Sequence, residues 1–546
     1  MKLKNKKIPI ISSIALVFAP IIGVVAGVSI KNNQLKTKEK HIAKIKQIWD
    51  SEFKDKFFDE SLKNINLSFN FKDVYLTNQK LLKTVTKRLK AHGLNISISK
   101  GEEDIEDKVW NETVINHKHK TQTFKIKYQD EVISLPFGEF NKVSTKFKDD
   151  SFEEITEIGY LITPDGLFTA IFLDSKSIDK QSQEKQKASL KKVPKILPPT
   201  IDSLNSAFSF IDGQEIKGIE KWDTSNVISM KNVFNGSENF NQALNWNTKN
   251  VIDMSGMFNR TSFNNDSIIK WNTSNVTNMS FMFFGATSFN QDINSWDVSN
   301  ITNMSSMFAN AEKFKKQLTK WDTSKVTNMS GMFANAVEFN GDIRKWKTSN
   351  VTDMSQMFLG SDSFDQDISG WDTSKVTRMN QMFLGTKNFN QNISSWNTSN
   401  VTNMSSMFEE AAKFDQNIGN WDVSNVTNMS SMFKKTKSFN QNIGNWDTSS
   451  VTDMRSMFSK AEKFNQDIST KQVQKGELKY TAWDVSNVKN MSEMFSGAKS
   501  FKHNISNWDV SKCERFENFI KGDSKMTKNL IPEKFRDDID NNIDVN

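Results

Sequence analysis

The chain offers few side chains that could carry out catalysis. Its five histidines are scattered along the sequence: His41, His92, His117, His119 and His503. Only His117 and His119 lie close together, beside lysines and without a third ligand for a metal ion. No phosphate-binding glycine loop, zinc-binding helix motif or nucleophile elbow is present, and the acidic residues at 102–107 have the pattern of a solvated run. We therefore expect a protein that is not an enzyme, with no catalytic residues, no metal site and no cofactor.

The sulfur-containing residues could bind a soft metal, but their arrangement favours packing. Cys513 is the single cysteine, so neither an intramolecular disulfide nor a thiolate cage can form. Of the 23 methionines, 21 fall in two columns of a repeated pattern, and no histidine column accompanies them. A methionine-lined ligand or copper site is the alternative to a methionine core. We favour the core, because the columns continue through the whole repeated region.

The repeat is most visible in tryptophan. The spacing in this column is 25 residues, with one interval of 24 and one of 37 that contains a 12-residue insertion at 470–481. Self-similarity at a fixed period of this size predicts stacked structural repeats. Twelve of the chain's 14 tryptophans belong to the column: Trp222, Trp246, Trp271, Trp296, Trp321, Trp346, Trp371, Trp396, Trp421, Trp446, Trp483 and Trp508.

Each unit has a constant set of apolar positions and no run long enough for a full helix. We expect coils in which Val-Thr-x-Met and Phe-Asn-Gln-x-Ile are strand-like and Met-Ser-x-Met-Phe forms a short helical turn. Parallel stacking at about 4.8 Å per coil would make about twelve coils a rod of roughly 60 Å. A single coil cannot bury both its faces, so the coils must fold as an array. In one unit the columns are Val426, Met429, Met432, Phe433, Phe439, Ile443 and Trp446, with small residues at positions such as Ala411, Thr436 and Ala461.

The solenoid is expected to span residues 201–520. The stretch 201–208 fits the columns without a tryptophan and predicts an opening half-coil. At the other end, Cys513, Phe516, Phe519 and Ile520 occupy the Val, Met, Met and Phe columns, so Cys513 is expected to be a buried core residue and not a nucleophile. The Pro-rich stretch 193–200 is interpreted as an extended connector and residues 521–546 as a polar cap and tail.

Residues 31–192 are expected to form an α+β domain. Apolar spacing predicts an amphipathic helix at 41–65, and a second helix at 79–91 with Leu82, Val85 and Leu89 on one face and Gly93 at its end. Alternation predicts strands at 95–99, 121–128 and 132–136 and a hairpin of 157–162 with 167–172. The polar stretch 175–192 is interpreted as a loop.

The N-terminus carries a targeting signal. Residues 1–7 are basic, and 8–30 form an apolar run of about 23 residues, longer than the roughly 7–15 of a secretory signal and long enough to span a membrane. We expect a cytoplasmic n-region, a single-pass signal-anchor and an extracellular remainder; cleavage near Val24-Val25-Ala26 and secretion is the alternative. Lysines follow the run as well, which weakens the orientation. The net charge of +8 is spread among interspersed acids and lysines, so no nucleic-acid partner is expected.

The unit Trp-Asp-x-Ser-x-Val-Thr-x-Met-x-x-Met-Phe-x-x-Ala-x-x-Phe-Asn-Gln-x-Ile resembles the 25-residue repeat of BspA-like leucine-rich repeat surface proteins, in the branch abundant in mollicutes. Ile158-Gly159-Tyr160 and the 193–208 segment are similar to the lead-in of such arrays, so the resemblance covers about residues 155–520. It implies a leucine-rich-repeat-like right-handed solenoid on the bacterial surface, associated with adhesion and host interaction, with no catalytic residues to carry over. Many mollicute surface proteins are anchored through an acylated cysteine after the signal. This chain has none there, which leaves anchoring to the apolar run.

Three functions remain open at this point. The array could be an adhesin that binds a host-cell or extracellular protein, since the pairs 309–310, 409–410, 434–435 and 459–460 vary on a constant core. It could instead be a passive envelope spacer or variable antigen. An enzymatic or transporter-associated role for residues 36–192 is the third, although no residue there indicates a chemistry. The sequence does not define the binding residues, the oligomeric state or the role of the insertion.

Overall fold

The computed structural model describes residues 15–57, 76–102, 105–115, 121–140, 145–163, 165–172, 189–522 and 524–536, with side chains from residue 31 onward. The chain forms two compact units. The first contains most of the chain up to residue 143 together with Leu161–Phe168. The second contains Ser144–Tyr160 and everything from Thr169 onward. The boundary between the two units falls within the expected domain at 31–192 and passes through its predicted hairpin.

The first unit begins with a long helix, α1 (Ala15–Ile48), which continues into a π-helical turn at Trp49–Phe53. The apolar spacing predicted its buried side, which includes Ile42, Ile45 and Phe53. The helix expected to reach residue 65 ends earlier, since Lys54 leaves the helical conformation at ψ 135°. The remainder of that prediction, 58–65, lies outside the described residues.

Among the described residues, no helix combines the length and apolarity that crossing a membrane requires. The expected signal-anchor at 8–30 falls partly on residues 1–14, which are not among those described, and partly on the beginning of α1, whose side chains are not described. That segment stays a prediction.

Helix α2 (Asn78–Ala91) agrees closely with its prediction. Thr77 caps its first turn by accepting a hydrogen bond from the Lys80 N–H. Gly93 follows its end at φ 78°, a left-handed conformation that favours glycine. The buried side consists of Leu81, Val85 and Leu89, so Leu81 takes the place predicted for Leu82.

A three-stranded antiparallel sheet, in the order β1-β2-β3, completes the first unit with the short helix α3 (Asp107–Glu112). Strands β2 (Thr123–Tyr128) and β3 (Glu131–Pro136) confirm the two predicted alternating stretches. The strand expected at 95–99 is shorter and later, because β1 is Ser99–Lys100. Trp49 packs between these elements, stacked 5.7 Å from Phe124.

The second unit opens with short strands that lead into the solenoid. Strands β4 (Lys146–Phe147) and β5 (Ile155–Glu157) pair antiparallel, and β6 (Gly159–Ile162) lies beside β7 (Phe168–Ile171) in the predicted hairpin. Thr169 then makes a parallel bridge to Ser203. Strand β7 therefore covers the open end of the array.

The segment 193–200, expected to be an extended connector into the array, packs against the first coil. Lys192 bridges in parallel to Lys217, and Val193 is buried with its N–H donating to the Lys217 carbonyl. The Pro194 carbonyl accepts the indole N–H of Trp222. This segment thus covers the face of the first coil that has no preceding coil to pack against.

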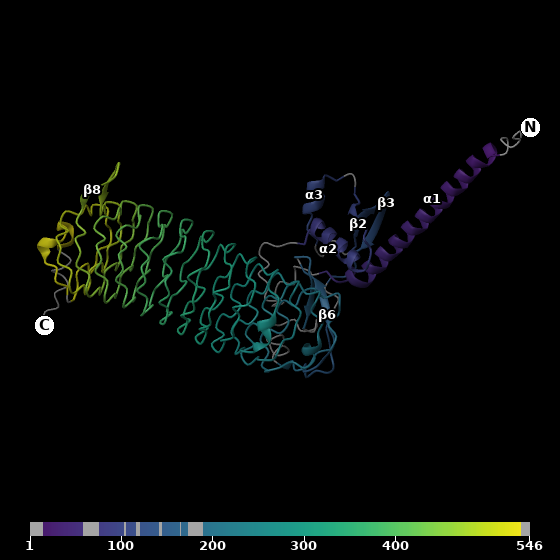
Figure 1. Ribbon diagram of the computed structural model, residues 1–546, viewed down its shortest axis with the longest axis horizontal. Coiled ribbons are helices and arrows are strands. Elements are labelled where there is room, and N and C mark those ends of the chain that lie inside the picture. The colour runs from purple at the N-terminus through teal and green to yellow at the C-terminus, as the bar shows by residue number, and fades with distance from the viewer. Residues whose placement is uncertain are drawn as a thin grey trace, which may run out of the picture. The chain divides into compact units, whose positions relative to one another are not determined.

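The coils stack regularly along the rest of the chain, from teal to yellow in Figure 1. One residue per coil makes a parallel bridge to its counterparts, in a series that runs through Asn303, Asn328 and Asp353 to Arg515. No longer parallel strand is present in the described coils, so the strand-like interpretation of Phe-Asn-Gln-x-Ile is wrong. The fold is nevertheless a repeat solenoid, as predicted.

The Met-Ser-x-Met-Phe segment is not a helical turn. In one coil the N–H groups of Met304, Ser306 and Phe308 donate to backbone carbonyls of the next coil. Other N–H groups of the same segment, such as that of Met307, donate to the carbonyl of the residue three positions earlier. Two positions per coil have positive φ, as at Ser306 (52°) and Asn310 (58°). Alternating conformations of this kind turn every second amide toward the neighbouring coil, which a helix cannot do.

The core consists of the predicted columns. Val426, Met429, Met432 and Phe433 are fully buried, and the small-residue column is buried beside them. Phe433 stacks on Phe439 in its own coil at 4.1 Å, and phenylalanines of this column stack between coils, as Phe308 does on Phe333 at 5.6 Å. Offset stacking of this kind adds to the stabilisation from buried area.

Both interruptions of the array are ordered. The insertion, predicted as a surface loop, is an antiparallel hairpin of β8 (Lys471–Lys475) and β9 (Leu478–Ala482) that projects from the coils (Figure 1). Gly476 has φ 63° in its two-residue turn. The Tyr480 hydroxyl donates to the Asn445 carbonyl at 2.7 Å, which fastens the hairpin to the array, and burial raises the pKa of Tyr480.

The C-terminal cap is more apolar than predicted. Ile531 and Phe535 are fully buried, and Phe535 stacks on Phe516 at 4.7 Å. Lys534 donates to backbone carbonyls of the last coil, including that of Cys513 at 2.7 Å. The two short 3-10 turns here are Lys528–Leu530 and Glu533–Phe535, and two more occur at Ile219–Lys221 and Asp266–Lys270. Residues 537–546 lie outside the described part.

Candidate binding surface

The tryptophan column determines how each coil sits on the previous one. Every indole of the column donates its N–H to a backbone carbonyl of the preceding coil, at distances between 2.8 and 3.3 Å. In the regular part the acceptor is the Ile or Leu that precedes the previous tryptophan, as for Trp371 and Ile343. The column therefore combines apolar burial with a directional bond that sets the register of stacking.

A second buried column is polar, and sequence reasoning missed it. Thr323, Thr348 and Thr373 are buried and donate their hydroxyls to a carbonyl of the next coil at 2.9 Å. Val298 and Val423 occupy the same column in other coils and are also buried. The exchange of threonine for its isostere valine at a constant position was the signal that could have identified it.

Aspartate and asparagine build the corners of each coil. In one coil, Asp422, Asn428 and Asn442 each accept the N–H of the residue two positions later, at 2.9 to 3.0 Å. These Asx turns provide the tight corners that a 25-residue coil needs. Hydrogen bonds to carboxylates favour the ionised form, and at Asp372 the hydroxyl and N–H of Ser374 lower the pKa of the carboxyl.

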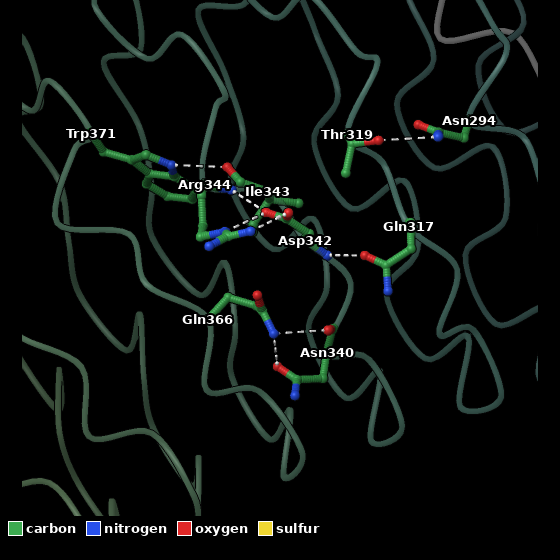
Figure 2. A network of polar contacts seen from close by, with 9 residues as sticks. All are labelled: Asn294, Gln317, Thr319, Asn340, Asp342, Ile343, Arg344, Gln366 and Trp371. Atoms are coloured by element: carbon green, nitrogen blue, oxygen red, sulfur yellow. Dashed lines mark hydrogen bonds and ion pairs between the residues drawn. The ribbon is translucent and has the colours of Figure 1, made fainter.

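The Phe-Asn-Gln segment forms a ladder of side chains between coils (Figure 2). Gln366 Nε2 donates to Asn340 twice, at 3.1 Å to its backbone oxygen and 3.0 Å to its side-chain oxygen. Nearby, the Asp342 N–H donates to Gln317 Oε1 at 2.6 Å. These side-chain amides therefore link neighbouring coils on this side of the array.

The same region shows how a charged pair sits on the ladder. Arg344 donates to Asp342 through two nitrogens, at 3.0 and 2.8 Å (Figure 2). The hydrogen bond from the Arg344 guanidinium holds the pKa of Asp342 below its ordinary value. The pair lies within one coil and is exposed on the arginine side, so it is worth little to stability.

The most varied surface lies over the Met-x-x-Met-Phe turn, and we call it the turn face. It consists of three adjacent columns, and inter-coil backbone bonds such as Phe308 N–H to the Met332 carbonyl hold neighbouring segments side by side. The first column precedes the second methionine, and the other two follow the phenylalanine. In the middle coils they hold Phe281, Ser306, Gly331, Gln356 and Gln381; Phe284, Ala309, Ala334, Leu359 and Leu384; and Gly285, Asn310, Asn335, Gly360 and Gly385.

The chemistry of the turn face changes along the array. Aromatic, aliphatic and glycine residues of the middle coils give way to Glu409, Glu410, Lys434 and Lys435. Glu410 pairs with Lys435 at 2.5 Å and Glu409 with Lys434 at 3.2 Å, each across one coil interface. These four side chains are exposed or half-exposed, as predicted.

Two of the positions predicted to be exposed are buried. Ala309 is 3% and Ser459 is 2% exposed, whereas Asn310 and Lys460 beside them reach solvent. Exposure at the first position after the phenylalanine differs between coils, since Ala309 is buried and Ala334 is half-exposed. The exposed variation is thus concentrated at the second position.

Several described titratable groups make structural contacts. No three His, Cys, Asp or Glu side chains of the described residues lie close enough to hold a metal ion. In the first unit, buried Glu52 pairs with Arg88 and with His92, which ties α2 to the end of α1. Burial raises the pKa of the Cys513 thiol, which disfavours the reactive thiolate. His117 and His119 lie outside the described residues.

Comparisons with known proteins identify the array. Comparison with curated proteins gave no match, and neither did comparison with solved structures. The chain matches the family described as "Mycoplasma protein of unknown function, DUF285" over residues 202–320, 302–417, 388–478 and 470–536. Together these segments run from 202 to 536, which is more than half of the 546 residues and almost the entire solenoid. The chain therefore belongs to this family of Mycoplasma repeat proteins.

Proposed function

We propose that the protein is a cell-surface binding rod that attaches to a host-cell or extracellular protein through its solenoid. The observation that carries the proposal is the contrast between core and surface. The core columns hold the same residues in coil after coil, whereas the second position of the turn face holds Arg260, Asn310, Gly360, Glu410 and Lys460. Variation confined to the surface of a constant frame suits recognition by many side chains at once.

Such a surface is prepared for binding before the partner arrives. Its backbone amides are committed to bonds between coils, as for Asn310 N–H and the Ala334 carbonyl at 2.7 Å. Little backbone freedom remains to be lost on association, so more of the contact energy would appear as affinity. The partner fits this chemistry best if it is a protein with both apolar and charged contacts.

Display outside the cell is part of the proposal. The basic residues 1–7 and the apolar run 8–30 would hold the chain in the membrane as a single-pass anchor, with residues from 31 onward outside. The resemblance to BspA-like leucine-rich repeat surface proteins supports the same placement. Protease treatment of intact cells tests it: the solenoid should be degraded, while residues 1–7 stay protected. A solenoid that survives until the cells are lysed would refute the placement.

A permutation of surface residues tests the recognition. In the variant, the exposed residues of the two positive-φ columns are exchanged among coils, for example Asn310 with Lys460 and Gln356 with Ser406. Composition, net charge and core stay the same, so the unpermuted chain is a matched control. We expect circular dichroism and the unfolding midpoint to be unchanged and attachment to host cells to fall at least tenfold.

Undiminished attachment by the permuted chain would favour a passive spacer or variable antigen. The observation that supports this alternative is the near identity of successive coils, which lengthen the array without adding a new kind of surface. Deletion of one 25-residue coil separates the two functions. A spacer should respond equally to the loss of any coil, whereas a binding rod should respond only when a contacting coil is removed.

A further inference from the structure

An apolar strip crosses the turn face in the middle of the array. It follows the first position after the phenylalanine: Phe284, Ala309, Ala334, Leu359 and Leu384, in five successive coils. The two leucines, Ala334 and Phe284 are half-exposed, and Phe281 beside them is 43% exposed. On the other side of the strip, Gly285, Gly360 and Gly385 carry no side chain that could cover it. The strip is thus a shallow apolar surface with open margins.

Opposite charges mark the two ends of this strip at equal distances from its centre. Arg260 occupies the second position three coils before Asn335, and Glu410 occupies it three coils after. Arg260 is exposed and makes no ion pair within the described residues. Glu410 is exposed and forms an ion pair with Lys435 of the next coil, which lies beyond the end of the strip. A half-turn about the coil of Ala334 therefore exchanges the position of the positive end with that of the negative end.

The same half-turn brings large residues onto small ones next to the axis and brings two large apolar residues together farther out. Counting coils outward from Ala334 places Ala309 opposite Leu359 and Asn310 opposite Gly360. It also places Phe284 opposite Leu384 and Ala334 on its own copy. An isologous interface requires a surface that is complementary to itself after rotation. This strip meets the requirement in size next to the axis and in charge at its ends.

We propose that two copies of this chain pair antiparallel through the turn face, about a twofold axis that passes through the coil of Ala334. The apolar strips cover one another, and Arg260 of each copy meets Glu410 of the other at both ends. Six coil spacings of about 4.8 Å separate these charges, or roughly 29 Å.

Disulfide trapping tests the axis on the full-length chain in detergent. The parent carries Cys513→Ser, and Ala334→Cys places one thiol per copy at the proposed axis. Thr377→Cys is the matched control, because Thr377 is exposed in the array but lies outside the turn face. At about 10 µM we expect the Ala334→Cys chain to form a disulfide-linked dimer on mild oxidation at least tenfold faster than the control.

Two further variants in the Ala334→Cys background show which contacts carry the pairing. Leu384→Glu should slow trapping at least tenfold, because it places a charge against Phe284 of the other copy. Arg260→Glu should also slow trapping, and Arg260→Glu combined with Glu410→Arg should restore it. Equal trapping of Ala334→Cys and Thr377→Cys, or no effect of Leu384→Glu, would overturn the proposal. Attachment of the Leu384→Glu chain to host cells is a separate measurement: attachment kept while trapping is lost would show that host binding does not depend on the dimer.

Discussion

Removing one ring from the phenylalanine stack should destabilise the array far more than removing an exposed ring of the same type. Phe358 is fully buried, lies 3.8 Å from Phe364 and stacks between Phe333 and Phe383 at 5.8 Å on each side. Truncating a buried phenylalanine to alanine costs about 3–5 kcal/mol, because the cavity it leaves is only partly filled. We therefore expect Phe358→Ala to lower the free energy of unfolding by about 4 kcal/mol.

Phe281→Ala is the control, because Phe281 is 43% exposed on the turn face of a nearby coil. Surface substitutions usually stay within about 0.5 kcal/mol, so the two variants should differ by more than about 3 kcal/mol. Urea unfolding followed by tryptophan fluorescence measures both, because the tryptophan column runs along the same core. If both variants shifted the midpoint equally, the stacked column would not be what holds neighbouring coils together.

Other substitutions address the directional bonds and the backbone. Trp371→Phe keeps an aromatic ring but removes the indole donor to the Ile343 carbonyl, which still accepts the N–H of Trp346. It should therefore cost about 0.5–1.5 kcal/mol in urea unfolding, and no change would mean that the bond contributes nothing. Gly385→Ala should cost about 1 kcal/mol, since Gly385 has φ 70° with only ordinary contacts around a new Cβ, whereas Gly370→Ala, with open space and no positive φ, should be neutral. Acidification tests the corner carboxylates such as Asp372, whose pKa is lowered in the folded state. Their contribution to the free energy of unfolding is complete at pH values above the ordinary aspartate pKa of about 3.9. It is lost as the pH falls through the lower pKa of the folded state. The thermal midpoint should therefore be steady from pH 7 to 5 and fall below about pH 4, and a midpoint that rose on acidification would reverse the assigned sign.

The sequence by itself determined the core of the array. Each coil repeats the same apolar residues at 25-residue spacing, and burial of such residues is the dominant favourable term in folding. The repeat alone therefore indicates which side chains must be covered, and Val426, Met429 and Phe433 are fully buried as expected. The helix α2 and the strands β2 and β3 were predictable for the same reason, since their apolar periods are local.

The polar framework required the tertiary structure. The acceptor for Trp371 lies 28 positions earlier, and that for Thr373 lies 24 positions later, so neither can be inferred from neighbours in sequence. The turn at Ser306 was predicted as helical because its apolar spacing fits a helix. Instead, alternate backbone N–H groups of this turn donate hydrogen bonds to carbonyls of the next coil. A hydrogen bond depends on where a carbonyl lies in space and not on residue type alone.

The ends of the array and its exposed surface were also decided by stacking. Residues 193–200 were predicted as a connector because prolines favour extended chains, yet the first coil would have an open face without Val193 against it. The same holds at the other end, where Phe535 covers the last coil from within a polar stretch. Apolar pattern indicates what must be buried; only the arrangement of neighbouring coils decides which segment buries it, and which residues, such as Leu359 and Arg260, remain at the surface.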